Sequence, residues 1–180
     1  MEILLIAFIA AVLAGAVVLY NGLIRMRQLT KNAWADVDVY LKRRAELIPN
    51  LVTAVKAYAS HEATLFEAIS TARSHAMEAQ SLPERANAEG RLGTAVHRAL
   101  FLAEQYPELR SSDNFLNLQR ELSETESKLA RARQYYNACV RDLNTKIEMF
   151  PSSLLAGVAG VKHGEYFQLE SASEREVPRV

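Results

Sequence analysis

The chain has 180 residues, of which 49% are hydrophobic, enough for one domain with a packed core. Its 7 glycines and 5 prolines are too few for the many turns of an all-β fold. The 21 basic and 21 acidic residues balance, so no overall positive charge favours nucleic acid as a partner. The single cysteine, Cys139, excludes an intramolecular disulfide and the multi-cysteine zinc patterns.

The first predicted element is an apolar helix. No charged residue occurs from Ile3 to Tyr20, and the uncharged run continues to Ile24. At about 1.5 Å per residue this run would span roughly 27 to 33 Å, which matches a bilayer core of about 30 Å. A cleaved signal peptide is the alternative, but Glu2 precedes the run in place of a basic residue, and the run is long for a signal core. We therefore expect an uncleaved transmembrane anchor over residues 1–24.

Basic residues dominate the stretch that follows the anchor. They are Arg25, Arg27, Lys31, Lys42, Arg43 and Arg44, opposed only by Asp36 and Asp38. By the positive-inside bias, this predicts a single-pass membrane protein with two residues outside and the C-terminal region in the cytoplasm. Inside the anchor, Ala7, Ala11 and Gly15 fall four residues apart, a spacing that lets two transmembrane helices approach closely.

The helical pattern continues through the basic run Lys42, Arg43, Arg44. On a helix that rises from the bilayer, Lys42 would lie some 33 Å beyond Tyr20, several Debye lengths from the lipid head groups. We therefore expect the three basic residues to pair with acidic residues of a neighbouring helix or subunit. Trp34, roughly 21 Å beyond Tyr20, should pack in the bundle or at a subunit contact.

Pro49 lacks a backbone donor and crowds the preceding turn, which predicts a kink or short break in the helix near this residue. Apolar periodicity resumes beyond it and runs through Ala59 and Glu62 to Ala76, which predicts a further helix over that stretch.

Two more helices are predicted downstream. Ser81 and Glu84 have capping-box spacing, and the helix that they start should end at Pro107. The next begins near residues 111–113 and stops at Pro151, with apolar positions that alternate spacings of three and four, a coiled-coil seam. We expect an all-α fold in which the anchor continues into an antiparallel bundle of three to four long helices over residues 25–150. Residues 151–180 form a tail, small and apolar and then polar, that either packs on the bundle or binds a partner.

No motif predicts catalysis, a cofactor or a metal. The sequence HEATL begins like a zinc-protease motif, but Leu65 stands where the second histidine would be. Cys139 lies on the apolar seam, where a small buried thiol is the ordinary case. The glycines near the C-terminus follow no strand, so they do not form a phosphate loop. We expect neither an enzyme nor a small-molecule substrate.

Two long blocks of the sequence resemble the LemA family. The first, Tyr20 to Glu62, contains AWADVD and KRRAELIPNLV, and the second, Asn114 to Gly160, contains NFLNLQRELSETE and YNACVRDLN. The ending EYFQLE is also similar, while Met26 and Thr30 stand where the family more often has aliphatic residues. The resemblance implies a single-pass bacterial membrane protein with a cytoplasmic helical bundle, and it implies no catalytic residues.

Two functions follow as hypotheses. The first is a membrane-anchored structural or scaffold protein that forms homo-oligomers through its helices, with the lipid bilayer as a partner and another membrane protein as a candidate partner. The alternative is an adaptor or regulator of a membrane protease or other membrane enzyme, because LemA family members are often encoded beside membrane metalloproteases. The candidate protein-interaction residues are Lys42, Arg43, Arg44 and Trp34.

Overall fold

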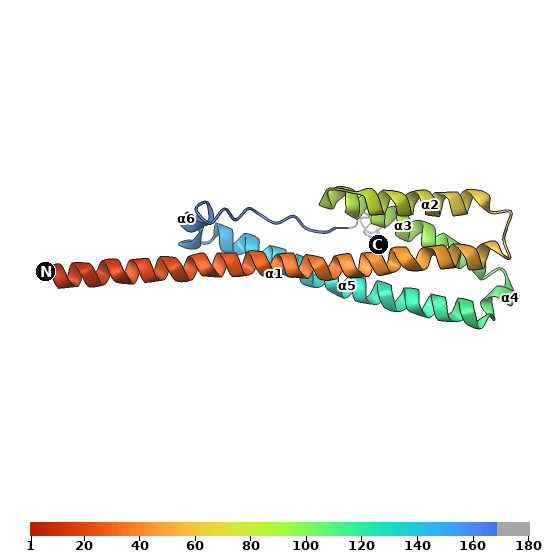
Figure 1. The fold of residues 1–180 in the computed structure, drawn as a ribbon, viewed down its shortest axis with the longest axis horizontal. Helices are drawn as coiled ribbons and strands as arrows, with labels where there is room; N and C mark the ends of the chain where they lie inside the picture. Colours follow the sequence, from red (N-terminus) through yellow and green to blue (C-terminus); the bar gives the residue numbers. More distant parts are fainter. Residues whose placement is uncertain (169–180) are drawn as a thin grey trace, which may run out of the picture. The chain divides into compact units, whose positions relative to one another are not determined.

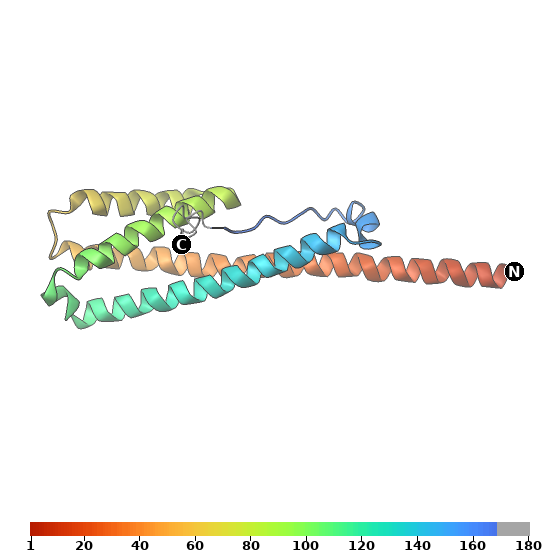
Figure 2. The same cartoon turned by 180° about the vertical axis from the view of Figure 1, so that it is seen from behind.

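The computed structural model describes residues 1–168, which contain helices and no strand (Figures 1 and 2). The predicted all-α class is confirmed. The helices are α1 (Glu2–Lys56), α2 (Ala63–Glu78), α3 (Leu82–Ala103), α4 (Pro107–Arg110), α5 (Asp113–Glu148) and α6 (Ser152–Ala156). The predicted tail over residues 151–180 is described only as far as residue 168.

The described residues divide into two compact units. The first unit comprises Met1–Val37 and Arg131–Tyr166, and the second comprises residues 38–130 with residues 167 and 168. Helices α1 and α5 therefore contribute to both units. The predicted domain boundaries, 1–24, 25–150 and 151–180, stay a prediction.

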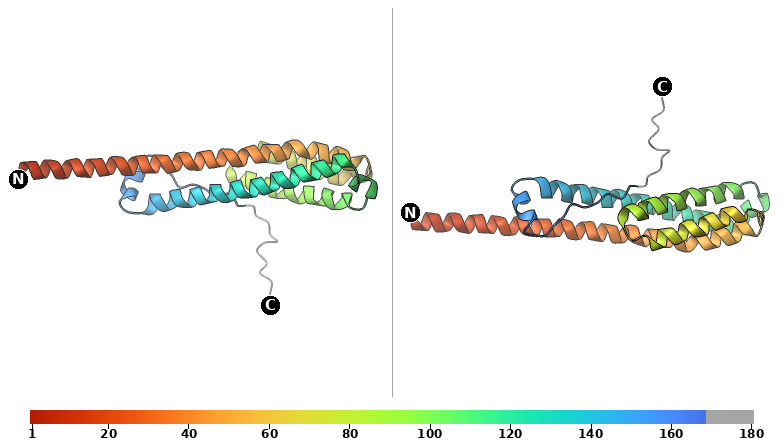
Figure 3. Two further views of the ribbon diagram at one scale, coloured as in Figure 1. Left: turned by 90° about the horizontal axis from the view of Figure 1, so that it is seen from below. Right: turned by 90° about the horizontal axis from the view of Figure 1, so that it is seen from above.

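In the second unit, the end of α1, helices α2, α3 and α4, and the start of α5 share one hydrophobic core. Figure 3 shows the ribbons of these helices. Its buried side chains recur every three or four residues along each helix, which is the pattern of an amphipathic helix with one face in a core. The fully buried members include Leu51 and Val55 of α1, Ile69 of α2, Leu92 and Ala99 of α3, and Leu109 of α4.

Helix α3 starts at the predicted capping box. The Ser81 hydroxyl accepts a hydrogen bond from the Glu84 backbone N–H, and the Glu84 carboxylate accepts one from the Ser81 N–H, each at 3.3 Å. Hydrogen bonds from the backbone and side chain of Ser81, and from the Gln80 backbone, hold the pKa of Glu84 below its usual value. These contacts satisfy donors that the first turn of a helix leaves open.

Helix α1 continues through Pro49 without a break. The proline cannot donate to the carbonyl of Ala45, four residues earlier, but the Arg73 Nε of α2 donates to that oxygen at 2.8 Å. A neighbouring helix thus satisfies the acceptor that the proline leaves open, and a bend at this residue stays a prediction.

The interruption lies later in the chain, contrary to the expected helix through Ala59 and Glu62. Helix α1 ends at Lys56 and α2 begins at Ala63, joined by a turn in which the Glu62 N–H donates to the Ala59 carbonyl at 3.1 Å. Ala59 is nevertheless fully buried. Ala59 lies in the turn but fills an apolar position of the core, so the helical spacing of apolar residues continues across the turn. The turn also contains no glycine or proline that would indicate it in the sequence.

In the first unit, Leu23 of α1 packs with Leu143 and Ile147 of α5 and with the segment that contains α6. That segment contributes three buried residues, Ala156, Ala159 and Val161. The chain then turns at Gly160, whose φ of 58° is a conformation that glycine adopts without strain. This core positions α6 against α1 at the end of the uncharged run.

Candidate functional site

The most unusual surface in the described residues is the apolar N-terminal part of α1. This helix is long and apolar enough to cross a membrane by length and composition, and its most apolar 18-residue window has a mean hydropathy of 2.9. No residue of that window is buried by the rest of the chain. Its exposed large side chains are Met1, Ile3, Leu4, Leu5, Ile6, Phe8, Ile9, Val12, Leu13, Val17 and Val18.

Such a surface is costly in water, because burying one large apolar side chain is worth about 1.5–3 kcal/mol. Ala7, Ala11 and Gly15 lie in this same exposed stretch. A Cβ added at Gly15 would meet no atom within 4 Å, so the chain itself leaves room for a close neighbour there. Their role in transmembrane packing stays a prediction.

The three consecutive basic residues of α1 have different surroundings. Lys42 pairs with Asp38 of its own helix at 2.7 Å. Arg43 reaches Glu121 of α5 at 2.8 Å, and these two side chains are 53% and 50% exposed. Arg44 is only 3% exposed. The predicted pairing with an acidic residue of a neighbouring helix is therefore confirmed for Arg43. It is also confirmed for Arg44, whose ion pair with Glu89 is buried.

Arg44 joins three helices in the interior of the second unit. Its guanidinium donates to the Glu89 carboxylate of α3, to the Glu89 backbone oxygen at 3.3 Å, and to the Glu126 carboxylate of α5 at 2.9 Å. Glu89 is also 3% exposed, whereas Glu126 is 45% exposed. A buried cation with two anions fixes how far each helix can slide past the others, since a shift of one turn would separate the charges.

The electrostatics of this site keep Arg44 charged. Burial acts to lower the pKa of its guanidinium, but the charges of Glu89 and Glu126, together with hydrogen bonds to both, raise the pKa above its ordinary value. A second pair, Arg85 of α3 with Asp38 of α1 at 2.8 Å, joins two of the same helices. Because Arg44 is inside its unit, only Lys42, Arg43 and Trp34 remain accessible as the predicted protein-interaction residues, and that role stays a prediction.

Trp34 packs against Tyr136 of α5 in the first unit, with ring centroids 5.3 Å apart and planes inclined by 59°. The Tyr136 hydroxyl donates to the Glu165 backbone oxygen at 2.9 Å. Burial, and then the charge of Glu165, raise the pKa of Tyr136. Trp34 was predicted to pack either in the bundle or at a contact between subunits. The structure shows a contact within the chain.

Tyr136 belongs to a set of residues on α5 that fasten the C-terminal segment. The Asn144 side chain donates to the Gly164 carbonyl at 3.0 Å and accepts from the Gly164 N–H at 2.8 Å. Gly164 lies so close to Val140 that an added Cβ would be 3.3 Å from its methyl carbon. Tyr136, Val140 and Asn144 all belong to the stretch YNACVRDLN of α5. The sequence alone did not indicate that this stretch holds the C-terminal segment. The segment thus packs on its own chain at Gly164 and Glu165, and Phe167 beyond them is also buried.

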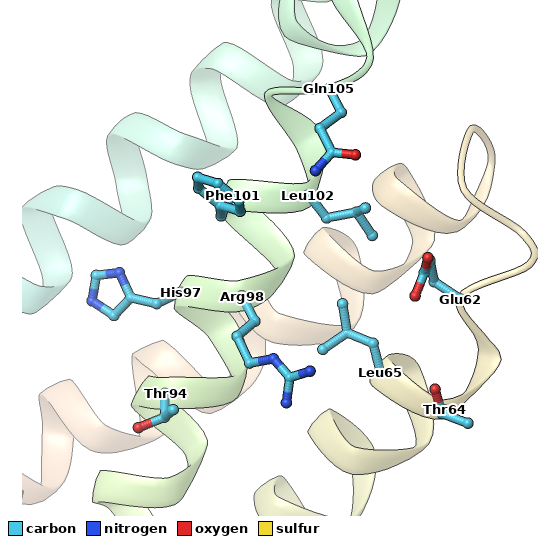
Figure 4. Close-up of a pocket in the computed structure, with 9 residues that line it drawn as sticks. All are labelled: Glu62, Thr64, Leu65, Thr94, His97, Arg98, Phe101, Leu102 and Gln105. Carbon is cyan, nitrogen blue, oxygen red and sulfur yellow. The ribbon is translucent and has the colours of Figure 1, made fainter.

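Other candidate sites offer less chemistry. A cavity of about 430 Å³ lies where α2 begins beside α3, and Figure 4 shows His97 and Arg98 on its rim pointing in different directions, with Leu65 facing the space beside Arg98. A cavity of about 440 Å³ lies between α1 and α5, lined by polar side chains that include Asn50 and Asn117. Over residues 1–168, no group of three or more His, Cys, Asp or Glu side chains could hold a metal ion.

Two residues noted in the sequence have structural roles. Cys139 is buried, and its backbone oxygen lies 3.4 Å from the hydroxyl of Thr30, which also donates to the Met26 carbonyl at 3.0 Å. The threonine that departs from the LemA pattern is therefore buried with its hydroxyl satisfied. His61 of the HEATL sequence is exposed and lies 3.8 Å from Glu62.

Comparison with known proteins agrees with the sequence resemblance. The chain is 28% identical over 195 aligned positions to Magnetosome protein MamQ 2 and to Magnetosome protein MamQ 1 of Paramagnetospirillum magneticum, covering 94% of this chain and 70% of each relative. It is 26% identical to Magnetosome protein MamQ of Magnetospirillum gryphiswaldense, covering 94% of this chain and 71% of the relative. The sequence model of the LemA family matches residues 33–180. The chain therefore belongs to the LemA family.

Proposed function

We propose that this protein is a non-catalytic structural protein, held in the bacterial cell membrane by residues 1–24, with the following residues on the cytoplasmic side. The observation that carries the proposal is the apolar end of α1, which the rest of the chain leaves uncovered. A bilayer would bury these side chains, and a helix can cross it because its backbone hydrogen bonds are satisfied internally. The basic residues after Ile24 support the orientation.

Self-assembly is the second part of the proposal. The stripe of small residues, Ala7, Ala11 and Gly15, would let two copies of the anchor pack closely in the bilayer. The ion pairs of Arg44 would make the second unit of each copy rigid, which suits a scaffold. The magnetosome proteins that the chain resembles are named for a cellular structure and not for a reaction, which is in keeping with such a role.

Two measurements test these parts separately. The full-length protein should stay with the membrane after an alkaline wash and be released only by detergent, and its appearance in the soluble fraction would contradict the anchor. In detergent, Gly15→Leu should shift the protein from oligomer to monomer. Ala16→Leu is the matched control, because residue 16 lies roughly 140° around the helix from the centre of the small-residue stripe. A monodisperse wild-type monomer at micromolar concentration would contradict self-assembly.

Crosslinking in native membranes distinguishes the alternative function. Crosslinks between copies of this chain are expected for a scaffold. A recurrent crosslink to one other membrane protein, with none between copies, would favour the adaptor or regulator of a membrane enzyme.

A further inference from the structure

We propose that residues 149–158, the turn after α5 together with α6, form a second membrane-contact site that enters the interface of the same bilayer. The inference rests on the proposed function, because it requires that α1 crosses the membrane. The ligand is the lipid surface itself, an anionic head-group layer above the acyl chains.

The first observation is an exposed apolar cluster, which we call the α6 turn. Met149, Phe150, Leu154 and Val158 are 54%, 78%, 70% and 79% exposed. Single exposed apolar residues are ordinary on a protein surface, but four large ones within ten residues mark an interaction site. No charged residue occurs from residue 149 to residue 161, so nothing in this stretch opposes entry into an apolar phase.

The second observation is where the α6 turn lies along α1. Its inner face packs on Leu23, which is completely buried, and Ile24 and Met26 lie against the same cluster. Figure 1 shows α6 beside α1. The uncharged run extends from Ile3 to Ile24, about 33 Å along a helix, and the hydrocarbon core of a bilayer is about 30 Å thick, so Leu23 lies at the end of the span. The head-group layer is roughly 5–7 Å deep on each side of the hydrocarbon core. The turn is therefore held at the level of the head groups.

The third observation is the charge around the turn. The nearest charged residues on the elements that form this region are Arg25 and Arg27 of α1, Lys146 and Glu148 at the end of α5, and Lys162 just after the turn. Four of these five are basic. His163 follows, and its Nδ1 lies 3.7 Å from a carboxylate oxygen of Glu148. An apolar tip with basic flanks is the arrangement by which protein segments lie in an anionic membrane surface.

The consequence would be attachment at two points. A single transmembrane helix can tilt and rotate in the bilayer. A second contact through Phe150 and Leu154, fixed to α1 by the core around Leu23, would set the angle at which the first unit leaves the membrane.

Depth-dependent quenching tests the inference on the full-length chain. In a Cys139→Ala background, single cysteines replace Phe150 or Leu154 and carry an environment-sensitive fluorophore. The protein is reconstituted into vesicles of phosphatidylcholine and phosphatidylglycerol with brominated acyl chains. We expect blue-shifted emission that the bromine quenches at both positions.

Two control positions make the outcomes separable. Val12→Cys lies in the proposed span and should be quenched, and the exposed Gln134→Cys, about 22 Å along α5 from the turn, should not be. Quenching at position 12 without quenching at 150 and 154 would overturn the second contact and leave the anchor intact. No quenching at position 12 would overturn the anchor and this inference with it. A blue shift at 150 without bromine quenching would mean that another copy of the chain covers the turn, which would also overturn the inference.

Discussion

Replacing Arg44 by methionine removes a buried cation that pairs with two acidic side chains, and it keeps a similar apolar stem. The carboxylate of Glu89 would then be buried without its ion-pair partner, since it is 3% exposed. Breaking a buried ion pair by removing one member typically costs about 3–5 kcal/mol. Glu126 is 45% exposed and can regain water, so it should add little to the loss.

The neighbouring residue provides a matched control. Arg43 also pairs with a carboxylate of α5, but both side chains are about half exposed, and exposed pairs contribute about 0–1 kcal/mol. Arg43→Met should therefore lower the free energy of unfolding much less than Arg44→Met. The double replacement Arg44→Met with Glu89→Leu should recover most of the loss, because a well-packed apolar pair can replace a buried ion pair.

Urea unfolding of the full-length protein in detergent, followed by circular dichroism at 222 nm, measures all four proteins. Urea is preferred to guanidinium because it adds no salt and does not screen the charges. Equal losses of stability in Arg43→Met and Arg44→Met would refute the reasoning. If the double variant is as unstable as Arg44→Met alone, the loss comes from disturbed packing around the methionine and not from an unpaired Glu89 carboxylate.

The remaining predictions concern single contacts. Arg73→Met should lower the free energy of unfolding by about 1–3 kcal/mol, because the Ala45 carbonyl loses its donor. The loss should be smaller in a Pro49→Ala background, where the backbone N–H of residue 49 can donate to that carbonyl. Equal losses in the two backgrounds would contradict the role given to Arg73. Asn144→Ala should expose residues 161–168 to limited proteolysis, with Asn144→Asp intermediate because it keeps only the acceptor; unchanged cleavage of both would mean that the segment is held elsewhere. Ser81→Ala should lower the free energy of unfolding by about 1 kcal/mol in the same urea titration, because the Glu84 N–H loses its acceptor. Folding lowers the pKa of Glu84, so its carboxylate stabilises the fold above its ordinary pKa, and this stabilisation is lost as the pH falls through the folded-state pKa. The unfolding free energies of Glu84→Gln and wild type should therefore differ at neutral pH and converge in acid.

Much of the fold could be predicted because its signals are local. The capping box at Ser81 and the prolines at residues 107 and 151 mark where helices begin or stop, and the apolar seam between residues 115 and 147 matches α5. The turn at residues 57–62 could not be found in this way. It contains neither glycine nor proline, and Ala59 occupies an apolar position of the core.

The contacts between distant segments were the least predictable. The sequence indicated that Arg43 and Arg44 would pair with acidic residues but not which of the 21 acids each would meet or that Arg44 would be buried. The role of Pro49 depends on Arg73, and that of Asn144 depends on the Gly164 backbone. Such pairs depend on three-dimensional proximity, which no local pattern of a single sequence encodes.

The central claim, that α1 crosses the membrane with the following residues inside, is tested most directly by cysteine accessibility in intact cells. In the Cys139→Ala background, a cysteine at Glu2 should react with a membrane-impermeant maleimide added outside. A cysteine at Tyr58, which is exposed in the second unit, should react only after the cells are opened. Labelling of residue 58 in intact cells, or of neither residue before lysis, would contradict the proposed topology.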